Sequence, residues 1–346
     1  MKPAPHGRLL VIAGKGGVGR STVAAAVGIA AASRGLRTAI AEVGGRSEMY
    51  RILGPPTARP RAPGSVDGSR IPAPPGVMTD AAPGTLSPGD HHRLHAPHGG
   101  APEREPAPAL RHVTIDRRSA LEEYLRNETP GRLPAALLAR SSTFKLFVDA
   151  TPGLSELLTI GKVWELTRRQ RTGRDAAGYD LVVLDAPASG ELIGLLGAPR
   201  TFGAIARVGP VARQAGAIDG ALRDPGSLGV VVVATPEQMP VSEALGLRDE
   251  LAARFGISLQ AAVVNRLFPL RLSSEERTAL AAAGDDPAIR AARWIHGRAV
   301  RQRTQLARLR RGMRGVRCIT LPMMFDGELD RAGVEHLAGL LAGRLP

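Results

Sequence analysis

The sequence predicts a doubly wound α/β fold with a mostly parallel sheet, a helical subdomain and a disordered insertion. Short apolar runs recur along the chain at residues 9–13, 38–43, 181–185, 228–234, 261–264 and, more weakly, 316–321. Such runs are typical of strands buried on both faces, and their alternation with helical patterns favours a parallel sheet. Ligands of these sheets bind beyond the carboxyl ends of the strands, so the residues after each run are the functional candidates.

Composition sets wide limits on function. With 346 residues, the chain can form one large α/β core or two smaller domains. Its net charge of +14 is almost entirely arginine, and the accompanying alanine, glycine and proline are typical of a GC-rich coding sequence, so the charge is weak evidence for a polyanion partner. Cys318 is the only cysteine, which excludes an intrachain disulfide and a cysteine-held metal cluster within one chain.

Targeting signals are not evident in the sequence. Residues 1–8 lack the apolar core of a signal peptide, and no stretch approaches the roughly 20 apolar residues of a membrane span. We therefore expect a cytoplasmic protein with no integral membrane segment.

A glycine-rich loop follows the first apolar run and precedes an alanine-rich helical pattern. The loop consists of Gly14, Lys15, Gly16, Gly17, Val18, Gly19, Arg20, Ser21 and Thr22. Strand, loop and helix in this order suit phosphate binding, because backbone N–H groups can turn around an anion at the positive end of the helix dipole. The hydroxyl of Ser21 is a candidate Mg²⁺ ligand. The alternative is a structural glycine turn that binds nothing.

The early lysine, Lys15, distinguishes this loop. A lysine directly after the first glycine marks the deviant Walker A loop, and the sequence here resembles the P-loop family of ArsA, MinD, ParA and the tail-anchored-protein targeting ATPase. The resemblance implies binding of ATP with Mg²⁺, and a sandwich of two subunits in which Lys15 reaches the partner's nucleotide. Arg20 departs from the family, because it stands where the loop lysine is usual and a forked guanidinium does not replace a compact ammonium.

A second motif begins at Asp185, the last residue of an apolar run. It resembles the second switch of the family, which implies that Asp185 holds Mg²⁺ and that Ser189 and Gly190 sense the γ-phosphate. The alternative is that Asp185 only caps the turn after its strand. Glu191 stands where the family usually has histidine.

The first switch of the family is altered in this sequence. An aspartate that positions the attacking water usually follows the strand at residues 38–43, but Gly44 occupies that place. Glu42 could serve if the alignment shifts by two residues. Without the orienting acid and the loop lysine, we expect slow hydrolysis with nucleotide binding retained. The predicted catalytic residues are Lys15, Arg20, Glu42 and Asp185.

Asn265 follows the run at residues 261–264 and resembles the base-recognition turn of the family, where the amide pairs with adenine. A simple Asx turn is the alternative. Residues 235–243 and 152–162 resemble a loop and the helical subdomain of ArsA-type proteins. The resemblance covers residues 8–269 apart from the insertion, and it is closer to ArsA-type ATPases than to MinD or ParA.

Four segments are expected. Residues 7–53 form the first part of the ATPase domain, and residues 54–109 form a disordered insertion rich in proline, glycine and histidine. Residues 110–178 form the helical subdomain, with a strand at 113–115 and helices at 118–126, 134–147 and 155–169. Residues 179–346 complete the ATPase domain with C-terminal helices. The insertion histidines at positions 91, 92, 95 and 98 indicate a solvated linker rather than a metal site.

Arginines dominate residues 290–317. A solvated helical face and an acidic protein partner are both compatible with this run, whereas nucleic acid is unlikely because only Trp294 accompanies the arginines. The last helix, at residues 328–341, has an apolar side made of Leu329, Val334, Leu337 and Leu341, which predicts docking on the core.

Three functional hypotheses remain at this point. The first is an ArsA-like ATPase whose Mg²⁺-dependent hydrolysis drives a conformational change in a homodimer, or in a heterodimer with an ArsA-like paralogue, that handles a cargo or membrane partner. The second is a non-hydrolysing scaffold subunit paired with an active paralogue. The third is a ParA-like nucleic-acid partitioning ATPase, which draws only on the basic charge.

Overall fold

A computed structural model describes residues 7–44, 48–53, 77–79, 110–116, 120, 153–168, 178–206, 209–270, 272–325 and 329–345. The helices predicted at residues 118–126 and 134–147 lie almost wholly outside these ranges. Most of the predicted insertion at residues 54–109 lies outside them as well. The boundaries of the predicted segments therefore stay predictions.

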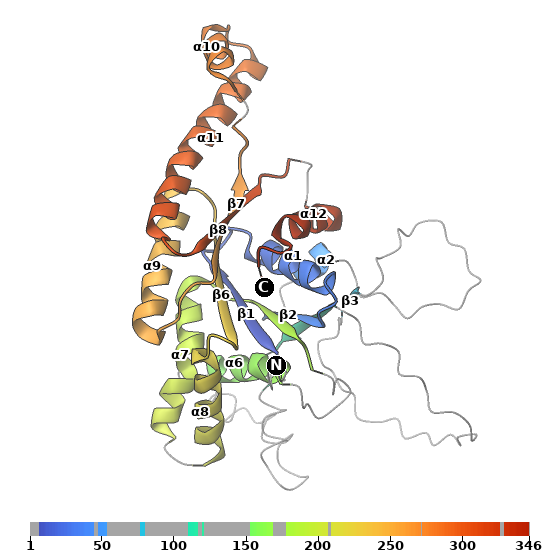
Figure 1. Cartoon of the computed structure of the whole chain (residues 1–346), viewed down its shortest axis with the longest axis vertical. Coiled ribbons are helices and arrows are strands. Elements are labelled where there is room, and N and C mark those ends of the chain that lie inside the picture. Colours follow the sequence, from blue (N-terminus) through green and yellow to red (C-terminus); the bar gives the residue numbers. More distant parts are fainter. Residues whose placement is uncertain are drawn as a thin grey trace, which may run out of the picture.

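The centre of the molecule is an eight-stranded sheet in the order β3-β4-β2-β5-β1-β6-β7-β8, in which all paired neighbours run parallel (Figure 1). The doubly wound α/β fold is thus confirmed. The strands are β1 (Arg8–Gly14), β2 (Thr38–Val43), β3 (Val77–Thr79), β4 (Leu110–Ile115), β5 (Leu181–Asp185), β6 (Leu228–Ala234), β7 (Ala261–Leu267) and β8 (Arg317–Pro322).

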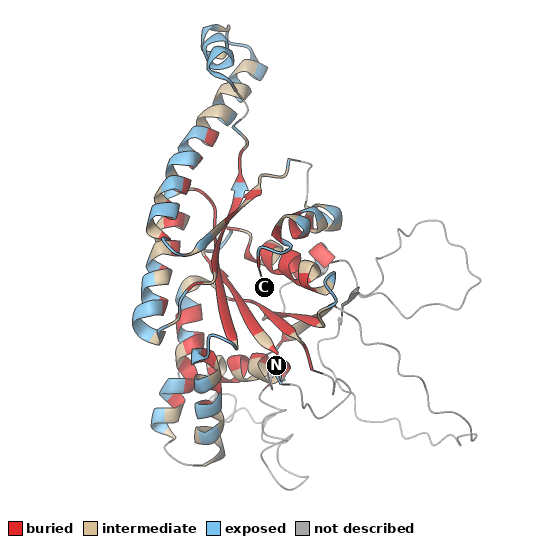
Figure 2. Cartoon of the chain, in the orientation of Figure 1, coloured by how far each residue is buried: buried red, intermediate tan, exposed pale blue. Residues whose placement is uncertain are grey.

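Helices cover both faces of the sheet and form two separate apolar cores with it. One core lies beneath α1 (Arg20–Ala32), α2 (Glu48–Leu53) and α12 (Arg331–Leu341). The other lies beneath α6 (Leu154–Thr167), α7 (Ser189–Ile205), α8 (Pro210–Arg223), α9 (Gln238–Phe255) and the C-terminal half of α11 (Pro287–Gly312). Figure 2 shows the central strands buried along their length, which explains why they are continuous apolar runs in the sequence.

A long helical arm extends beyond the sheet. The arm consists of the N-terminal half of α11 and of α10 (Ser274–Ala282), and α10 lies at the tip of the arm (Figure 1). Of the residues in α11, only Ala299, Gln302, Leu306 and Leu309 are buried. The second half of α11 therefore packs on the core. The first half, which belongs to the arm, is exposed or half-buried. No helix in the described ranges is both long and apolar enough to cross a lipid bilayer.

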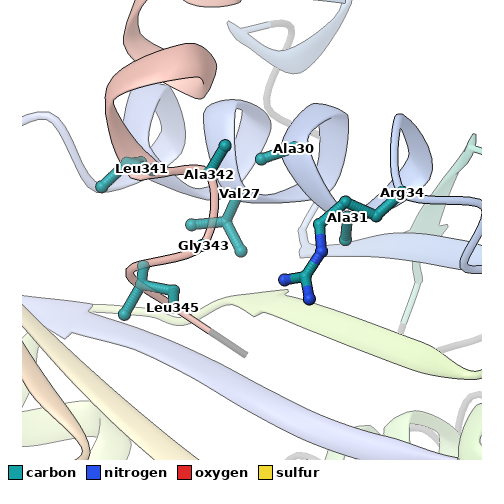
Figure 3. A pocket seen from close by; sticks show the side chains of 8 residues that line it. All are labelled: Val27, Ala30, Ala31, Arg34, Leu341, Ala342, Gly343 and Leu345. Carbon is teal, nitrogen blue, oxygen red and sulfur yellow. The ribbon is translucent and has the colours of Figure 1, made fainter.

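The C-terminal helix docks on α1, as its apolar side predicts. Val334, Leu337 and Leu341 are buried in the same core as α1. Figure 3 shows Leu341 and Leu345 beside Val27 of α1, around a gap of only ≈ 10 Å³. A gap of that size holds about one water molecule at most, so this junction is packing rather than a ligand site.

The structure differs from the sequence prediction at several strand ends. Strand β4 begins three residues before the predicted 113–115, and β7 extends past residue 264 to Leu267. The short strand β3 lies within the predicted insertion and pairs with β4. Pairing with a neighbouring strand determines each of these differences, and that information is not local to the sequence.

Docking of α12 predicts a specific loss of stability. Leu337 is 2% exposed, so Leu337→Ala should lower the free energy of unfolding by about 2–5 kcal/mol in urea titration, because it leaves a cavity against α1. His336→Ala on the exposed side of the same helix is the control, and it should change stability by less than about 0.5 kcal/mol. Equal losses in the two variants would contradict the docking.

Candidate phosphate-binding site

The glycine loop connects β1 to α1 at the carboxyl edge of the sheet. Its backbone is irregular, because Gly17 and Gly19 have φ values of 82° and 90°. These left-handed conformations are open to glycine and disfavoured for residues with a Cβ. A Cβ on Gly19 would also lie 2.3 Å from Nδ2 of Asn265, whereas one on Gly17 would meet no atom within 4 Å. The loop is therefore held tightly on the side of Asn265 and open at Gly17.

Ser21 and Asp185 meet directly at this edge. The Ser21 hydroxyl donates a hydrogen bond of 2.7 Å to Oδ2 of Asp185, which is 8% exposed at the end of β5. Hydroxyl and carboxylate oxygens are the hard ligands that Mg²⁺ prefers. The donor set at the start of α1 therefore fits a magnesium ion. The sequence predicts that these two residues hold Mg²⁺, and that role stays a prediction.

The side chain of Arg20 is directed toward the end of β5. It is 8% exposed, and its Nη1 donates a hydrogen bond of 2.6 Å to the carbonyl of Ala186, the residue after Asp185. A buried guanidinium needs such acceptors, because burial without them is costly. Arg20 thus links α1 to the end of β5.

Lys15 forms an ion pair with Glu243 of α9. Both side chains are partly exposed, at 35% and 36%. They lie on the wall of a hollow of ≈ 510 Å³ that the loop shares with α9 and the start of α7. The other lining residues are Gly16, Ala188, Ser189, Gly190, Gly246, Leu247 and Glu250.

Ser189 lies at the first position of α7 and faces this hollow. Its Oγ is buried and has no hydrogen-bond partner among the described residues. Gly190 follows it and is exposed. A hydroxyl without a partner, beside two N–H groups at a helix start, is suited to donate a hydrogen bond to an anion.

Glu42 has a buried partner that the sequence did not reveal. Its Oε2 lies 3.0 Å from Nε2 of His112 on β4, and Glu42 itself is 1% exposed. Glu42 is also the neighbour of Asp185 in the pairing of β2 with β5. The other carboxylate oxygen, Oε1, is buried and has no hydrogen-bond partner among the described residues.

Gly44 follows β2 with a φ of 83°, and it is exposed. Its backbone N–H donates a hydrogen bond of 3.2 Å to the carbonyl of Ile115, and a Cβ at this position would meet no atom within 4 Å. A side chain at this position would have room, but the positive φ disfavours a residue with a Cβ.

Asn265 contacts the glycine loop rather than open space. Its Nδ2 donates a hydrogen bond of 3.0 Å to the carbonyl of Val18, and its Oδ1 accepts one of 2.9 Å from the N–H of Arg266. The residue is 4% exposed. Recognition of a base by this amide, as the sequence predicts, would require it to exchange or share these bonds.

The arginine run of α11 divides into two groups. Arg290, Arg293 and Arg298 are engaged with Asp285, with the last carbonyls of α10 and with Glu237, respectively. Arg298 also lies over the rings of Phe268 and Trp294, with its Cζ 5.3 and 5.5 Å from their centroids. The second group is exposed and consists of Arg301, Arg303, Arg310 and Arg311; Arg308 is half-buried, and Arg314, just after the helix, is exposed. A solvated face and an acidic partner both remain compatible with this group.

His112 and Gln302 escaped the sequence analysis. Glu243 and Arg266 lay in or beside motifs singled out there, at residues 235–243 and after Asn265, but they were not assigned a role. Polar residues at inward positions of β2 and β4 were a weak signal for the pair of Glu42 and His112. Nothing in the sequence indicated that α9 would bring Glu243 to Lys15. In the described residues, His, Cys, Asp and Glu form no group of three or more that could hold a metal ion.

Comparison with known proteins shows that this chain is similar in sequence to proteins from two mycobacteria. ATPase BagA from Mycobacterium tuberculosis is 26% identical over 278 residues, which cover 80% of this chain and 70% of BagA. A relative from Mycobacterium bovis matches with the same identity and coverage, and its name also includes the word ATPase. No protein-family model matches the chain.

The contact between Gly19 and Asn265 yields a prediction. Gly19→Ala should destabilise the protein by about 1 kcal/mol more than Gly35→Ala, because its Cβ displaces the Asn265 amide from Val18. Gly35 is the matched control, since its φ of 83° is similar and a Cβ there meets no atom within 4 Å. Urea unfolding of both variants measures the difference. Equal destabilisation would show that the Asn265 side chain does not hold the loop.

Proposed function

We propose that this chain is an ArsA-type ATPase that binds ATP with Mg²⁺ and works as one half of a two-subunit sandwich. The observation that carries the proposal is the 2.7 Å contact between Ser21 and Asp185 beside the glycine loop. It unites the two candidate Mg²⁺ ligands, from segments far apart in the sequence, at the start of a helix. The names of the mycobacterial relatives support an ATPase.

Each part of the site has a proposed role in binding. The N–H groups of the loop from Gly14 to Thr22 cradle the phosphates, Ser21 and Asp185 hold Mg²⁺, and Ser189 with Gly190 contacts the γ-phosphate. Asn265 would pair with the base through its amide, in exchange for its present bond to Val18. Bound Mg²⁺ neutralises charge on the phosphate oxygens.

Hydrolysis by this chain alone is proposed to be slow. Arg20 stands at the usual position of the lysine, and its guanidinium is engaged with the carbonyl of Ala186. Gly44 offers no carboxylate to orient water, and Glu42 is bound to His112. Phosphoryl transfer depends on charge and water held in position, and both are reduced here. Binding depends mainly on backbone donors, which this chain retains.

Lys15 connects the site to a partner subunit in this proposal. In the single chain it is paired with Glu243, at the wall of an open hollow. In a sandwich, Lys15 exchanges Glu243 for the nucleotide of the partner. A homodimer satisfies this arrangement, and so does a heterodimer with an ArsA-like paralogue whose own loop is intact.

A second candidate function is a nucleotide-binding scaffold subunit that does not hydrolyse ATP. The engagement of Arg20 and the open position at Gly44 favour it, because both changes affect turnover more than binding. In that case the paralogue performs the chemistry.

Single-turnover hydrolysis tests the impaired site. We expect the double variant Arg20→Lys with Gly44→Asp to hydrolyse ATP at least about tenfold faster than the wild-type chain, because it restores a cation and an acid at the γ-phosphate. The aspartate has room, since nothing lies within 4 Å of a Cβ on Gly44.

The matched control combines Arg20→Lys with Gly35→Asp, which adds an acid at a similar positive φ away from the loop. It should remain slow. A wild-type chain that is already as fast as the double variant would contradict the impaired site. Tight binding without turnover in every variant would favour the scaffold.

A further inference from the structure

A β-bulge in β7 directs two consecutive side chains toward the glycine loop. Val264 pairs with Thr320 of β8, whereas the next pairing joins Leu267 to Pro322, so β7 contains one residue more than β8 over this interval. In a regular strand, neighbouring side chains point to opposite faces. The extra residue removes that restriction, and bulges commonly re-aim side chains next to functional sites.

Both residues of the bulge bond to consecutive carbonyls of the loop. Asn265 Nδ2 donates to the carbonyl of Val18 at 3.0 Å, and Arg266 Nη1 donates to the carbonyl of Gly17 at 3.1 Å. The side chain of Arg266 is otherwise exposed. The contact to Gly17 is therefore made at the protein surface, by a long side chain that reaches from β7 to the glycine loop.

Arg266 has an unusual backbone conformation. Its φ is 58°, and no other non-glycine residue among those described has a positive φ. An L-amino acid with a Cβ is disfavoured here, and glycine is the residue best suited to it. Such outliers persist where the surroundings determine them, and they concentrate at functional sites.

Buried contacts on α11 hold this conformation in place. Gln302 is 3% exposed; its Nε2 donates to the carbonyl of Arg266 at 3.2 Å, and its Oε1 accepts from the N–H of Phe268 at 2.7 Å. On the other side, Oδ1 of Asn265 accepts from the N–H of Arg266. The backbone of Arg266 is thus secured without its guanidinium, which is free to act on the loop.

The geometry of the peptide bond shows what this contact does. In a trans peptide the C=O and the following N–H point in opposite directions. A donor that holds the carbonyl of Gly17 toward β7 therefore turns the N–H of Val18 the other way. The bond from Asn265 to the carbonyl of Val18 has the same effect on the N–H of Gly19.

We propose that Arg266 is a positioning residue for nucleotide phosphates. It acts through Gly17 by keeping the N–H of Val18 directed into the cradle, and it does not itself serve as a ligand in this role. The inference rests on the proposed ATP binding. It explains why a residue with a long, charged side chain occupies a backbone position that favours glycine.

The test uses the full chain and the probe Mg·ATP, with dissociation constants from calorimetry and unfolding temperatures of the nucleotide-free protein. The variants are Arg266→Gly and Arg266→Ala, which both remove the guanidinium but differ in how well they adopt a positive φ. Arg34→Ala is the control, because it removes the same charge from an exposed site at the opposite end of α1. Arg34 has no side-chain hydrogen bond or ion pair within the described residues.

We expect both Arg266 variants to bind Mg·ATP about five- to tenfold more weakly than the wild-type chain, as for loss of one typical hydrogen bond at an exposed site. Arg266→Gly should unfold at a higher temperature than Arg266→Ala. Equal losses of affinity in two variants of different stability show a positioning role, because a purely structural role would make affinity follow stability. Arg34→Ala should bind as the wild type does.

Three results would overturn the inference: wild-type affinity in Arg266→Gly, affinity that follows stability across the two variants, or an equal loss in Arg34→Ala. If the wild-type chain does not bind Mg·ATP, the proposed function fails and this inference fails with it. Unchanged affinity in the Arg266 variants of a binding-competent chain removes the inference alone.

Discussion

The hydrogen bond from Ser21 to Asp185 is the contact around which this edge of the sheet is arranged. It joins the beginning of α1 to the end of β5, and it is possible because β1 and β5 are parallel neighbours with Ile12 opposite Asp185. Arg20, one residue before Ser21, bonds to the carbonyl one residue after Asp185. The start of the helix is thereby held to the strand twice, and the loop before it has little freedom to shift along the sheet.

Much of the fold could be predicted from the sequence because parallel strands buried on both faces are continuous apolar runs. Strands β1, β2, β5 and β6 have this form, and the helix after the loop is alanine-rich. The extension of β7 to Leu267 could not be predicted in this way, since it depends on pairing with β8 across an intervening segment that contains α10 and α11. The short strand β3 depends in the same way on β4.

In the site, the types of residue could be predicted from the sequence, whereas the directions of their side chains could not. Residue types and spacing indicated which side chains would gather at the carboxyl edge, and Ser21 and Asp185 do meet there. Direction is set by neighbours that lie elsewhere in the sequence. Arg20 is directed to Ala186, Asn265 to Val18 and Glu42 to His112, because each of these polar side chains is buried and forms a hydrogen bond with a polar group that the fold brings within reach. Their roles toward a nucleotide stay predictions.

Because of the bulge in β7, the site depends on the number of residues between Val264 and Leu267 as well as on which residues they are. Deletion of one residue between Val264 and Leu267 would restore regular pairing with β8, but it would remove Asn265 or Arg266 itself, so that only one side chain of the pair would remain to contact the loop. An insertion elsewhere, in a surface connection, carries no such penalty. Among relatives, spacing across this interval should therefore vary less than spacing in the surface loops, even where the residues differ.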